Sequence, residues 1–213
     1  MKIIAFNGSP RKNWNTSTLL QKVLEGAISK GAQTELIHLY DLNFKGCKSC
    51  FECKIKGGKS YGECSIVDEL TPVLKMIKEI KALVLGTPVY FGAISGEMKS
   101  FIERLMFPYR TYTDPPMTLF PKKIKTGFIC TMNVTENDMK KLGYRQFIET
   151  NEMFLTAIFG SVTTLLSFDT YQFVNYSQMV ADRFDVKKKE KRRKEIFPSD
   201  CEKAYNIGRW LAK

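Results

Sequence analysis

The stretch MKIIAFNGSPRKNWNTSTLLQKVLEGAISKG, residues 1–31, decides the fold class because it holds a strand, a loop and a helix in succession. Residues 2–6 form a short apolar run that ends at the turn-forming Asn7–Pro10. Beyond the loop, apolar residues recur at the 3.6-residue period of an amphipathic helix: Leu20, Val23, Leu24, Ala27 and Ile28. The sequence therefore predicts a strand, a polar loop and a helix, with Thr16 or Ser17 as the helix N-cap.

The same alternation continues along the chain. Further strands are predicted at 35–40, 82–85, 126–131 and 162–168. Further helices are predicted at 70–77, 98–106, 139–159 and from residue 199 onward. Five strands that alternate with helices are typical of a three-layer α/β domain with a parallel sheet and right-handed crossovers. We expect residues 1–213 to form one such domain, with a cysteine-rich loop at 44–64 and a basic stretch at 187–194.

Composition limits the class of protein. The chain has 213 residues, of which 44% are hydrophobic and 26% charged, a balance typical of globular proteins. No apolar run approaches the roughly 18 residues of a membrane-spanning helix, and the first residues are too few and too weakly apolar for a signal peptide. We therefore expect a cytoplasmic protein that has no membrane partner.

The net charge of +11 is concentrated in KKKEKRRK, residues 187–194, which holds seven cations and one glutamate. A run of this kind can bind nucleic acid or another anionic partner. Aromatic side chains, on which bases would stack, do not interleave with the charges. We therefore interpret the run as a solvated helix or loop face and do not expect a nucleic-acid partner.

The loop NGSPRKNWNTST, residues 7–18, combines hydroxyl, amide and cationic side chains and runs directly into a helix N-terminus. Free backbone N–H groups, the positive end of the helix dipole and hydroxyl donors are what a phosphate group needs. The side chains that would serve it are those of Ser9, Arg11, Lys12, Asn15, Thr16 and Ser17. Neither GxxxxGK[ST] nor GxGxxG is present, which disfavours ATP and a Rossmann-type NAD site. The alternative is a polar turn with a capping threonine.

A second loop follows the predicted strand at 82–85. Thr87-Pro88 ends the apolar run, Val89–Gly92 forms an aromatic loop, and a helix begins near Ser95. Backbone donors on a rigid turn, with aromatic faces beside them, suit a flat apolar cofactor. The alternative is a set of core aromatic residues at a turn.

Four of the six cysteines lie within residues 44–64. Cys47, Cys50 and Cys53 have the spacing C-x-x-C-x-x-C, and Cys64 follows after ten residues. In a reducing compartment such a group is more often metal-binding or catalytic than a disulfide framework. The open alternatives are an iron–sulfur cluster, a Cys₄ zinc site, and reduced thiols that pack or form a redox pair.

Together these segments resemble the flavodoxin-like NADPH-dependent FMN reductase family. The resemblance lies in GSPRKNWNTS (8–17), TPVYFG (87–92), SGEMKSFIER (95–104) and FPSDCEKAYNIGRWL (197–211). It implies a five-stranded parallel sheet in the order 2-1-3-4-5 and FMN held without a covalent bond. The loop with C-x-x-C-x-x-C spacing resembles the iron–sulfur flavoprotein subset of this family, although the spacer before Cys64 is longer than usual there.

The resemblance also implies the roles of individual residues. The FMN phosphate would lie on Ser9, Arg11, Asn15, Thr16 and Ser17. The isoalloxazine ring would lie against Pro88, Val89, Tyr90, Phe91 and Gly92. The other edge of the ring would face Thr131, Met132 and Asn133, and a [4Fe–4S] cluster on Cys47, Cys50, Cys53 and Cys64 would lie at the same sheet edge and pass single electrons to the flavin.

The expected function is that of an FMN-dependent oxidoreductase that transfers electrons through the flavin, with a [4Fe–4S] cluster as a further electron carrier. One alternative is a cluster-free NAD(P)H-dependent FMN or quinone reductase. Another is a flavodoxin-like electron-transfer protein that has no substrate of its own. We expect a homodimer or homotetramer that receives electrons from a nicotinamide donor or a redox carrier. His38, Cys130 and Cys201 are interpreted as structural residues, and no Ser–His–Asp triad is expected.

Overall fold

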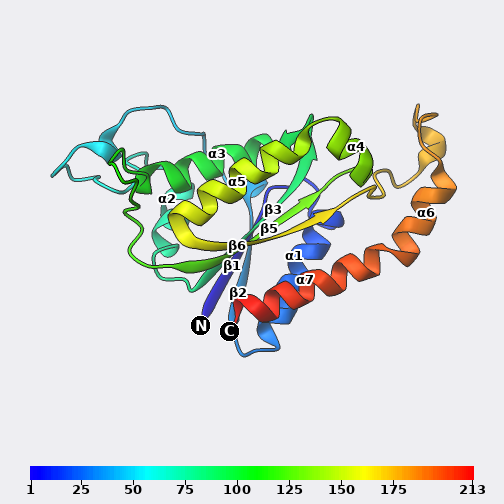
Figure 1. Cartoon of the computed structure of the whole chain (residues 1–213), viewed down its shortest axis with the longest axis horizontal. Coiled ribbons are helices and arrows are strands. Elements are labelled where there is room, and N and C mark those ends of the chain that lie inside the picture. The colour runs from blue at the N-terminus through cyan, green and yellow to red at the C-terminus, as the bar shows by residue number, and fades with distance from the viewer.

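The strand–loop–helix unit at the start of the chain is present in the computed structural model, which describes residues 1–213. Strand β1 (Lys2–Asn7) leads through a loop into helix α1 (Asn15–Ile28) (Figure 1). Five of the six β1 residues are buried. This burial follows from the position of β1 inside the sheet, where it pairs in parallel with β2 (Gln33–His38) and with β3 (Ala82–Tyr90).

The sheet has the predicted strand order. Strands β5 (Ile124–Thr131) and β6 (Gly160–Ser167) complete the parallel series β2-β1-β3-β5-β6. The two-residue strand β4 (Ala93–Ile94) stands outside this series and pairs antiparallel with the end of β3. Counting only the parallel strands, the order is the predicted 2-1-3-4-5, and the flavodoxin-like fold is confirmed.

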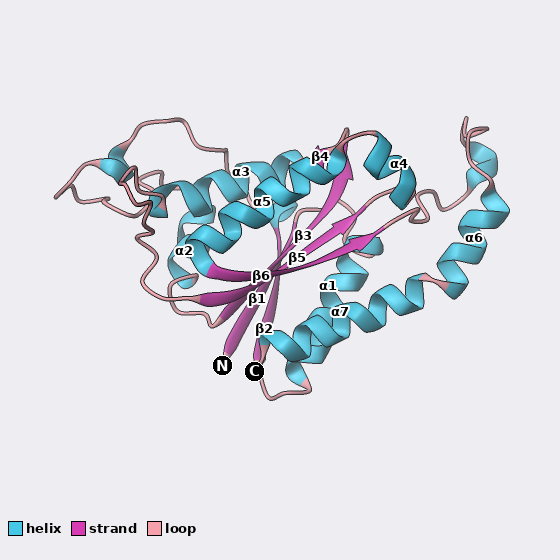
Figure 2. Ribbon diagram, in the orientation of Figure 1, coloured by secondary structure: helices cyan, strands magenta, loops and turns pink.

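Helices cover both faces of the sheet (Figure 2). On one face lie α1 and α7 (Phe197–Leu211); on the other lie α2 (Leu70–Met76), α3 (Gly96–Met106) and α5 (Tyr144–Phe159). The buried apolar residues form two clusters, one for each face. Successive strand residues enter opposite clusters, as the two-residue period of a strand requires: Ile4 and Phe6 belong to one cluster, Ile3 and Ala5 to the other.

Two segments differ from the sequence prediction, and a third, the basic run, takes the helical one of the two forms that the sequence left open. The aromatic loop at 89–92 is a tight β3–β4 hairpin, so part of its backbone takes part in strand pairing. The helix predicted at 139–159 is two helices, α4 (Glu136–Lys141) and α5, because Gly143 between them has a left-handed φ of 73°. The basic run forms a separate helix, α6 (Val186–Glu195), immediately before α7.

Helices α1 and α7 cross in backbone contact at two glycines. A Cβ atom added at Gly26 would lie 1.9 Å from the carbonyl oxygen of Tyr205, and one added at Gly208 would lie 1.8 Å from that of Val23. Real Cβ atoms do not come so close to backbone oxygens. The absence of a side chain at these two positions therefore sets how closely α7 packs on α1.

The connecting segments contain four short 3₁₀ turns. They are η1 (Leu39–Asp41), η2 (Glu52–Lys54), η3 (Phe107–Tyr109) and η4 (Tyr176–Gln178). The turn η2 lies inside the cysteine-rich loop, and η3 directly follows α3. Among the helices, none has both the length and the apolar character needed to cross a membrane.

Candidate functional site

A cavity of about 120 Å³ lies at the carboxyl ends of β1, β3 and β5. Ligands of open parallel sheets bind at this edge. Ten of the thirteen residues expected around FMN line it: Ser9, Arg11, Asn15, Thr16, Pro88, Val89, Tyr90, Thr131, Met132 and Asn133. The other three, Ser17, Phe91 and Gly92, are not part of its wall. Two loops far apart in the sequence are thus brought to one opening.

The N-terminus of α1 has no side-chain cap. The N-cap residue is Trp14, whose side chain accepts no hydrogen bond from the helix, and the expected caps Thr16 and Ser17 lie inside the first turn. The first helical hydrogen bond runs from the Thr18 N–H to the Trp14 carbonyl. Backbone N–H groups earlier in this turn therefore have no intrahelical acceptor, the arrangement that receives an anion at a helix N-terminus.

A buried hydroxyl in the same turn has no partner. Ser17 is fully buried, and its Oγ atom makes no hydrogen bond. A buried hydroxyl without a partner costs free energy unless another group satisfies it. The uncapped helix end and this free hydroxyl together suit a ligand that carries several acceptor oxygens, such as a phosphate group.

Arg11 is held by an aromatic side chain and a distant loop. Its guanidinium carbon lies 3.9 Å from the ring centroid of Trp14. One guanidinium nitrogen donates to the carbonyl of Gln172 at 2.6 Å, and the indole N–H of Trp14 donates to the carbonyl of Tyr171 at 3.0 Å. Burial lowers the pKa of Arg11, against the opposing effect of Tyr90. The segment after β6, which the sequence analysis did not single out, therefore fixes the cation of the first loop.

Two further contacts tie the first loop to other strands. The hydroxyls of Thr16 and Thr131 lie 2.7 Å apart, which joins the start of α1 to the end of β5. Ser95 caps α3 through the Met98 N–H and donates its own hydroxyl hydrogen to the carbonyl of Gly8. The cavity wall is therefore cross-linked by side chains and does not depend on the loops alone.

The β3–β4 hairpin places its aromatic tip outside the cavity. Phe91 and Gly92 form the turn with positive φ values of 49° and 81°. The Phe91 side chain is fully exposed, whereas Val89 and Tyr90 line the cavity. Contact of a flavin ring with Phe91 and Gly92 of the same chain is thus not favoured by this geometry.

The cysteine-rich loop lies away from this cavity. The backbone N–H of Cys47 donates to Glu103, and the sulfur of Cys64 accepts a hydrogen bond from Arg104, so both cysteines lie near the C-terminal end of α3. The first loop meets the other end of α3, where the N-cap Ser95 bonds to the Gly8 carbonyl. Ser95 and Arg104 lie about 13 Å apart along the helix axis. The structure therefore corrects the expectation that the cysteines lie at the same sheet edge as the flavin.

The other three thiols of the loop lie near the buried Cys53, but the four do not converge on one centre. Burial raises the pKa of Cys53, and the nearby Cys64, Cys47 and Cys50 act in the same direction while Lys54 opposes them. All six cysteines of the chain are free thiols. No three His, Cys, Asp or Glu side chains are arranged so that they could hold a metal ion. The arrangement therefore does not fit a tetrahedral zinc site.

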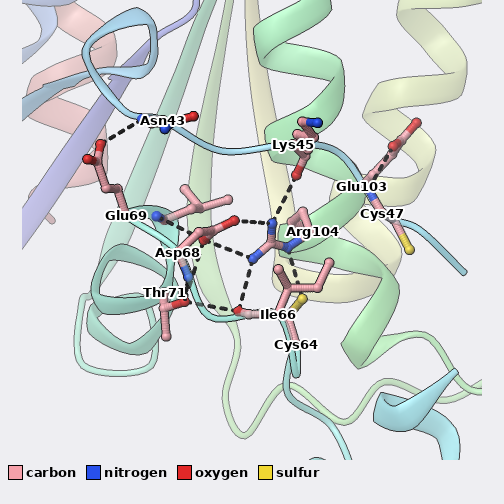
Figure 3. Close-up of polar contacts among 11 residues, drawn as sticks. Asn43, Lys45, Cys47, Cys64, Ile66, Asp68, Glu69, Thr71, Glu103 and Arg104 are labelled. Atoms are coloured by element: carbon pink, nitrogen blue, oxygen red, sulfur yellow. Dashed lines mark hydrogen bonds and ion pairs between the residues drawn. The ribbon is translucent and has the colours of Figure 1, made fainter. Parts of the chain in front are cut away.

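Arg104 is the centre of a buried polar network beside the cysteines (Figure 3). Its side chain is 0% exposed. It forms a two-pronged ion pair with Asp68, at 2.8 and 3.2 Å, and donates to the carbonyls of Lys45 and Ile66 and to the sulfur of Cys64. These bonds use all five N–H donors of the guanidinium. The network therefore fixes both ends of the cysteine-rich loop to α3.

The ion pair shifts the titration of both partners. Burial works to lower the pKa of Arg104, but the hydrogen bonds and charges of Asp68 and Cys64 raise it above the ordinary value. Burial works to raise the pKa of Asp68, and the hydrogen bond and charge of Arg104 outweigh it, so that pKa is lowered. Both groups are thus held in their charged forms.

Lys54 provides a second anchor for the same loop. Its ammonium group donates to the carbonyl oxygens of Phe107, Pro108 and Arg110, which follow the C-terminal end of α3. Burial lowers the pKa of Lys54. Three carbonyls suit an ammonium group, which has three N–H donors. Cys53, the neighbour of Lys54 in the chain, is therefore held in place from within the fold.

The basic run is only partly a solvated face. Lys189 is buried and forms an ion pair with Asp169 at 2.5 Å, and it donates to the side chain of Asn133. Arg192 forms an ion pair with the buried Asp200. The interpretation of the whole run as a solvated face is therefore wrong for these two cations, because both form ion pairs inside the protein.

The residues interpreted as structural lie apart from the cavity. His38, at the end of β2, has its Nδ1 atom 3.0 Å from the side-chain amide of Asn7, and burial lowers its pKa. Cys130 is buried in β5, and burial raises the pKa of its thiol. Cys201 lies half-buried in α7. None of the three lines the cavity at the strand ends.

Comparison with known sequences gives one family match and several relatives. The profile of the family described as NADPH-dependent FMN reductase matches residues 1–124. An iron–sulfur flavoprotein of Methanocaldococcus jannaschii is 38% identical over 104 residues, which are 49% of this chain and 51% of that protein. An iron–sulfur flavoprotein of Archaeoglobus fulgidus is 42% identical over 104 residues, 49% of this chain and 48% of the relative. In both matches the chain spans about half the length of the curated relative.

Solved structures share the fold over nearly the whole chain. The NAD(P)H:quinone oxidoreductase from Methanothermobacter marburgensis has a TM-score of 0.70 and 17% identity, covering 98% of this chain and 96% of that one. An FMN-dependent NADH-azoreductase from Bacillus anthracis, solved in complex with FMN, has a TM-score of 0.68 and 14% identity, covering 100% of both chains. At these identities the likeness supports the architecture alone.

Proposed function

The chain belongs to the NADPH-dependent FMN reductase family, and from this premise we propose that it binds FMN at the carboxyl ends of β1, β3 and β5 and acts as a flavin-dependent oxidoreductase. The observation that carries the proposal is the cavity that joins an uncapped helix N-terminus to the β3–β4 hairpin. Bound FMN would supply the redox chemistry, while the protein binds and orients the cofactor.

The phosphate end would lie at the start of α1. There the backbone N–H groups of the first turn supply donors, and Ser9 and Thr16 add hydroxyls at the cavity wall. The free hydroxyl of Ser17 lies in the same turn, outside the cavity wall, and would donate to the phosphate once the ligand is bound. Arg11, held flat against Trp14, supplies positive charge. The carboxamide of Asn15 is already bonded to Tyr171 through its nitrogen, so we assign Asn15 a role in shaping the wall.

The ring end would lie along the second loop. Pro88, Val89 and Tyr90 form one side of the cavity, and Thr131 and Met132 at the end of β5 form another. Val89 and Tyr90 are held by pairing with β4. A rigid wall of this kind restricts the ring to one orientation, which is the contribution expected of the protein in a flavin enzyme.

The nicotinamide donor and the oligomeric state are also proposed on this basis. The family description names NADPH as the reductant, and we propose a nicotinamide donor for this chain. We further propose a homodimer or homotetramer. The fully exposed Phe91, at the tip of the hairpin that borders the cavity, is the feature that favours contact with a second copy here.

FMN binding is tested by fluorescence titration of the purified chain with FMN and with riboflavin, which lacks the phosphate. Ser17→Ala is expected to weaken FMN binding about 10- to 100-fold, because a hydrogen bond to a charged group contributes roughly 1.5–3 kcal/mol, and to leave riboflavin binding unchanged. The matched control is Ser29→Ala at the other end of α1, where the hydroxyl bonds to the Gly26 carbonyl.

Three outcomes separate the alternatives. Rapid oxidation of NADPH or NADH by the FMN-loaded protein supports the reductase. Bound flavin that is reduced only by a protein carrier supports an electron-transfer protein that has no substrate of its own. A wild-type chain that binds neither flavin contradicts the proposed function.

A [4Fe–4S] cluster on Cys47, Cys50, Cys53 and Cys64 is the second candidate. It is favoured by the gathering of the other three thiols around the buried Cys53 and by the iron–sulfur flavoproteins among the relatives. The thiols do not converge in this structure, so the candidate requires the loop to rearrange around the cluster.

Iron and acid-labile sulfide, measured after anaerobic purification and reconstitution, test the second candidate. About four of each per chain are expected. Cys50→Ser is expected to lower the iron and sulfide content sharply, while the control Cys201→Ser in α7 leaves that content unchanged. Iron content near zero in the reconstituted wild-type chain would exclude the cluster and favour the cluster-free reductase.

A further inference from the structure

Helix α6 has one face that is built for contacts inside the protein. Lys189, Arg192 and Arg193 stand at positions i, i+3 and i+4, which share one side of a helix. The Lys189 and Arg192 side chains are 4% and 13% exposed, whereas Lys191 and Lys194 lie in the solvent. The seven cations of the run therefore divide into an outer set in water and an inner set with specific partners.

The inner face reaches the candidate flavin cavity at two places. One guanidinium nitrogen of Arg193 donates to the Oδ1 atom of Asn15 at 2.7 Å. Lys189 donates to the side-chain oxygen of Asn133. Asn15 and Asn133 both line the cavity, one at the start of α1 and the other after β5. The helix thus spans the outside of the wall and bonds to it at both ends.

The contact between Arg193 and Asn15 fixes the orientation of a buried side chain. Asn15 is 5% exposed, and its Nδ2 atom donates to the carbonyl of Tyr171 at 2.9 Å. A guanidinium can only donate and a carbonyl can only accept, so the two partners settle which end of the carboxamide is oxygen. The Arg193 guanidinium is itself held over the ring of Phe197 at 4.2 Å. The carboxamide of Asn15 can therefore neither flip nor turn toward solvent.

We propose that Arg193 is a positioning residue for the phosphate end of the flavin site, acting through Asn15. Asn15 is the first residue of α1, in the turn where the backbone N–H groups have no intrahelical partner. By fixing its side chain against Tyr171, Arg193 holds that turn in the shape that receives a phosphate. This inference rests on the proposed binding of FMN, and it gives the basic helix a role that needs no anionic partner.

The test compares FMN with riboflavin in four proteins: wild type, Arg193→Gln, Asn15→Ala and the double variant. Arg193→Gln is expected to weaken FMN binding about tenfold and to change riboflavin binding by less than about twofold, because riboflavin has no phosphate to be received. If Arg193 acts through Asn15, the double variant binds FMN no more weakly than Asn15→Ala does, since the second change removes a contact that is already lost.

Two controls separate this role from charge and from stability. Lys194→Gln removes one positive charge from the neighbouring, exposed position, and it is expected to change the affinity for either flavin by less than about twofold. Arg193→Lys keeps the charge and loses the planar fork, so intermediate FMN binding is expected. Thermal melting curves show whether each variant is folded, and Arg193→Lys replaces Arg193→Gln if the latter is not.

The outcomes distinguish the inference from the proposed function. If wild type binds FMN more tightly than riboflavin and Arg193→Gln keeps that preference, the inference is wrong and the proposed function stands. The inference is also wrong if Arg193→Gln weakens FMN and riboflavin binding equally. It is likewise wrong if the losses of FMN affinity in the two single variants add in the double variant. If wild type binds neither flavin, the proposed function fails, and the inference that rests on it fails as well.

Discussion

Replacing Arg104 with methionine is expected to lower the free energy of unfolding by about 3–5 kcal/mol, the range found when one partner of a buried ion pair is removed. The change leaves the Asp68 carboxylate without its two-pronged partner. It also leaves the Lys45 carbonyl without its side-chain donor, and the Ile66 carbonyl keeps only the hydrogen bond from the Thr71 hydroxyl. Urea unfolding followed by circular dichroism measures the loss.

The control for this prediction is Arg145→Met, which removes a guanidinium from an exposed ion pair with Glu149. Exposed pairs of this kind contribute about 0–1 kcal/mol, so a small effect is expected. The double variant Arg104→Met, Asp68→Leu is expected to recover part of the loss, because no charge is then buried alone. A loss below about 1 kcal/mol for Arg104→Met would show that water reaches Asp68 and that the network does not hold the loop.

Placing a methyl group at Gly208 is expected to cost about 3 kcal/mol or more, at the upper end of the effects of overpacking. The added Cβ would lie 1.8 Å from the Val23 carbonyl oxygen and 2.8 Å from the Ala27 nitrogen. Both atoms belong to the backbone of α1 and cannot move away as a flexible side chain can. The helices must therefore separate, and the apolar contacts between them are weakened along their length.

Gly96→Ala is the matched control for Gly208→Ala. Gly96 opens α3, and a Cβ added there meets nothing within 4 Å. Alanine has the higher helix propensity, so this variant is expected to be neutral or to gain up to about 1 kcal/mol. Thermal melting of both variants checks the comparison. If Gly208→Ala melts at the wild-type temperature, the close crossing of α1 and α7 is not a feature of the protein in solution.

The sheet order and the two loops that line the cavity could be predicted because they depend on short-range pattern. Strand and helix periods, together with the turn at Asn7–Pro10, establish the first β–loop–α unit from a few consecutive residues. The loops at 8–17 and 87–92 carry enough matching residues to resemble a known family. Most of the cavity wall follows from these two segments. The β3–β4 hairpin could not be foreseen, because Ala93-Ile94 is too short to show a strand period.

The long-range partners of the site could not be predicted. Arg193 lies 178 residues from Asn15, and nothing in KKKEKRRK distinguishes its buried cations from its exposed ones. Arg104 stands in a helix that reads as amphipathic, where an arginine is normally solvated. Its burial follows from the cysteine-rich loop that folds over it. The position of that loop in turn depends on Lys54 and Arg104, whose partners lie in other segments.

The close crossing of α1 and α7 also sets an order of events at the ribosome. Val23 and Ala27 of α1 form part of the apolar cluster that α7 completes. All the residues between Ile28 and Phe197 must be synthesised before α7 emerges, which takes roughly 10 to 30 s at ordinary rates. During this interval the apolar face of α1 is exposed and chaperones can bind it. The helices and strands that form the opposite face of the sheet can already assemble. We therefore expect the docking of α7 on α1 to follow the assembly of the opposite face of the sheet.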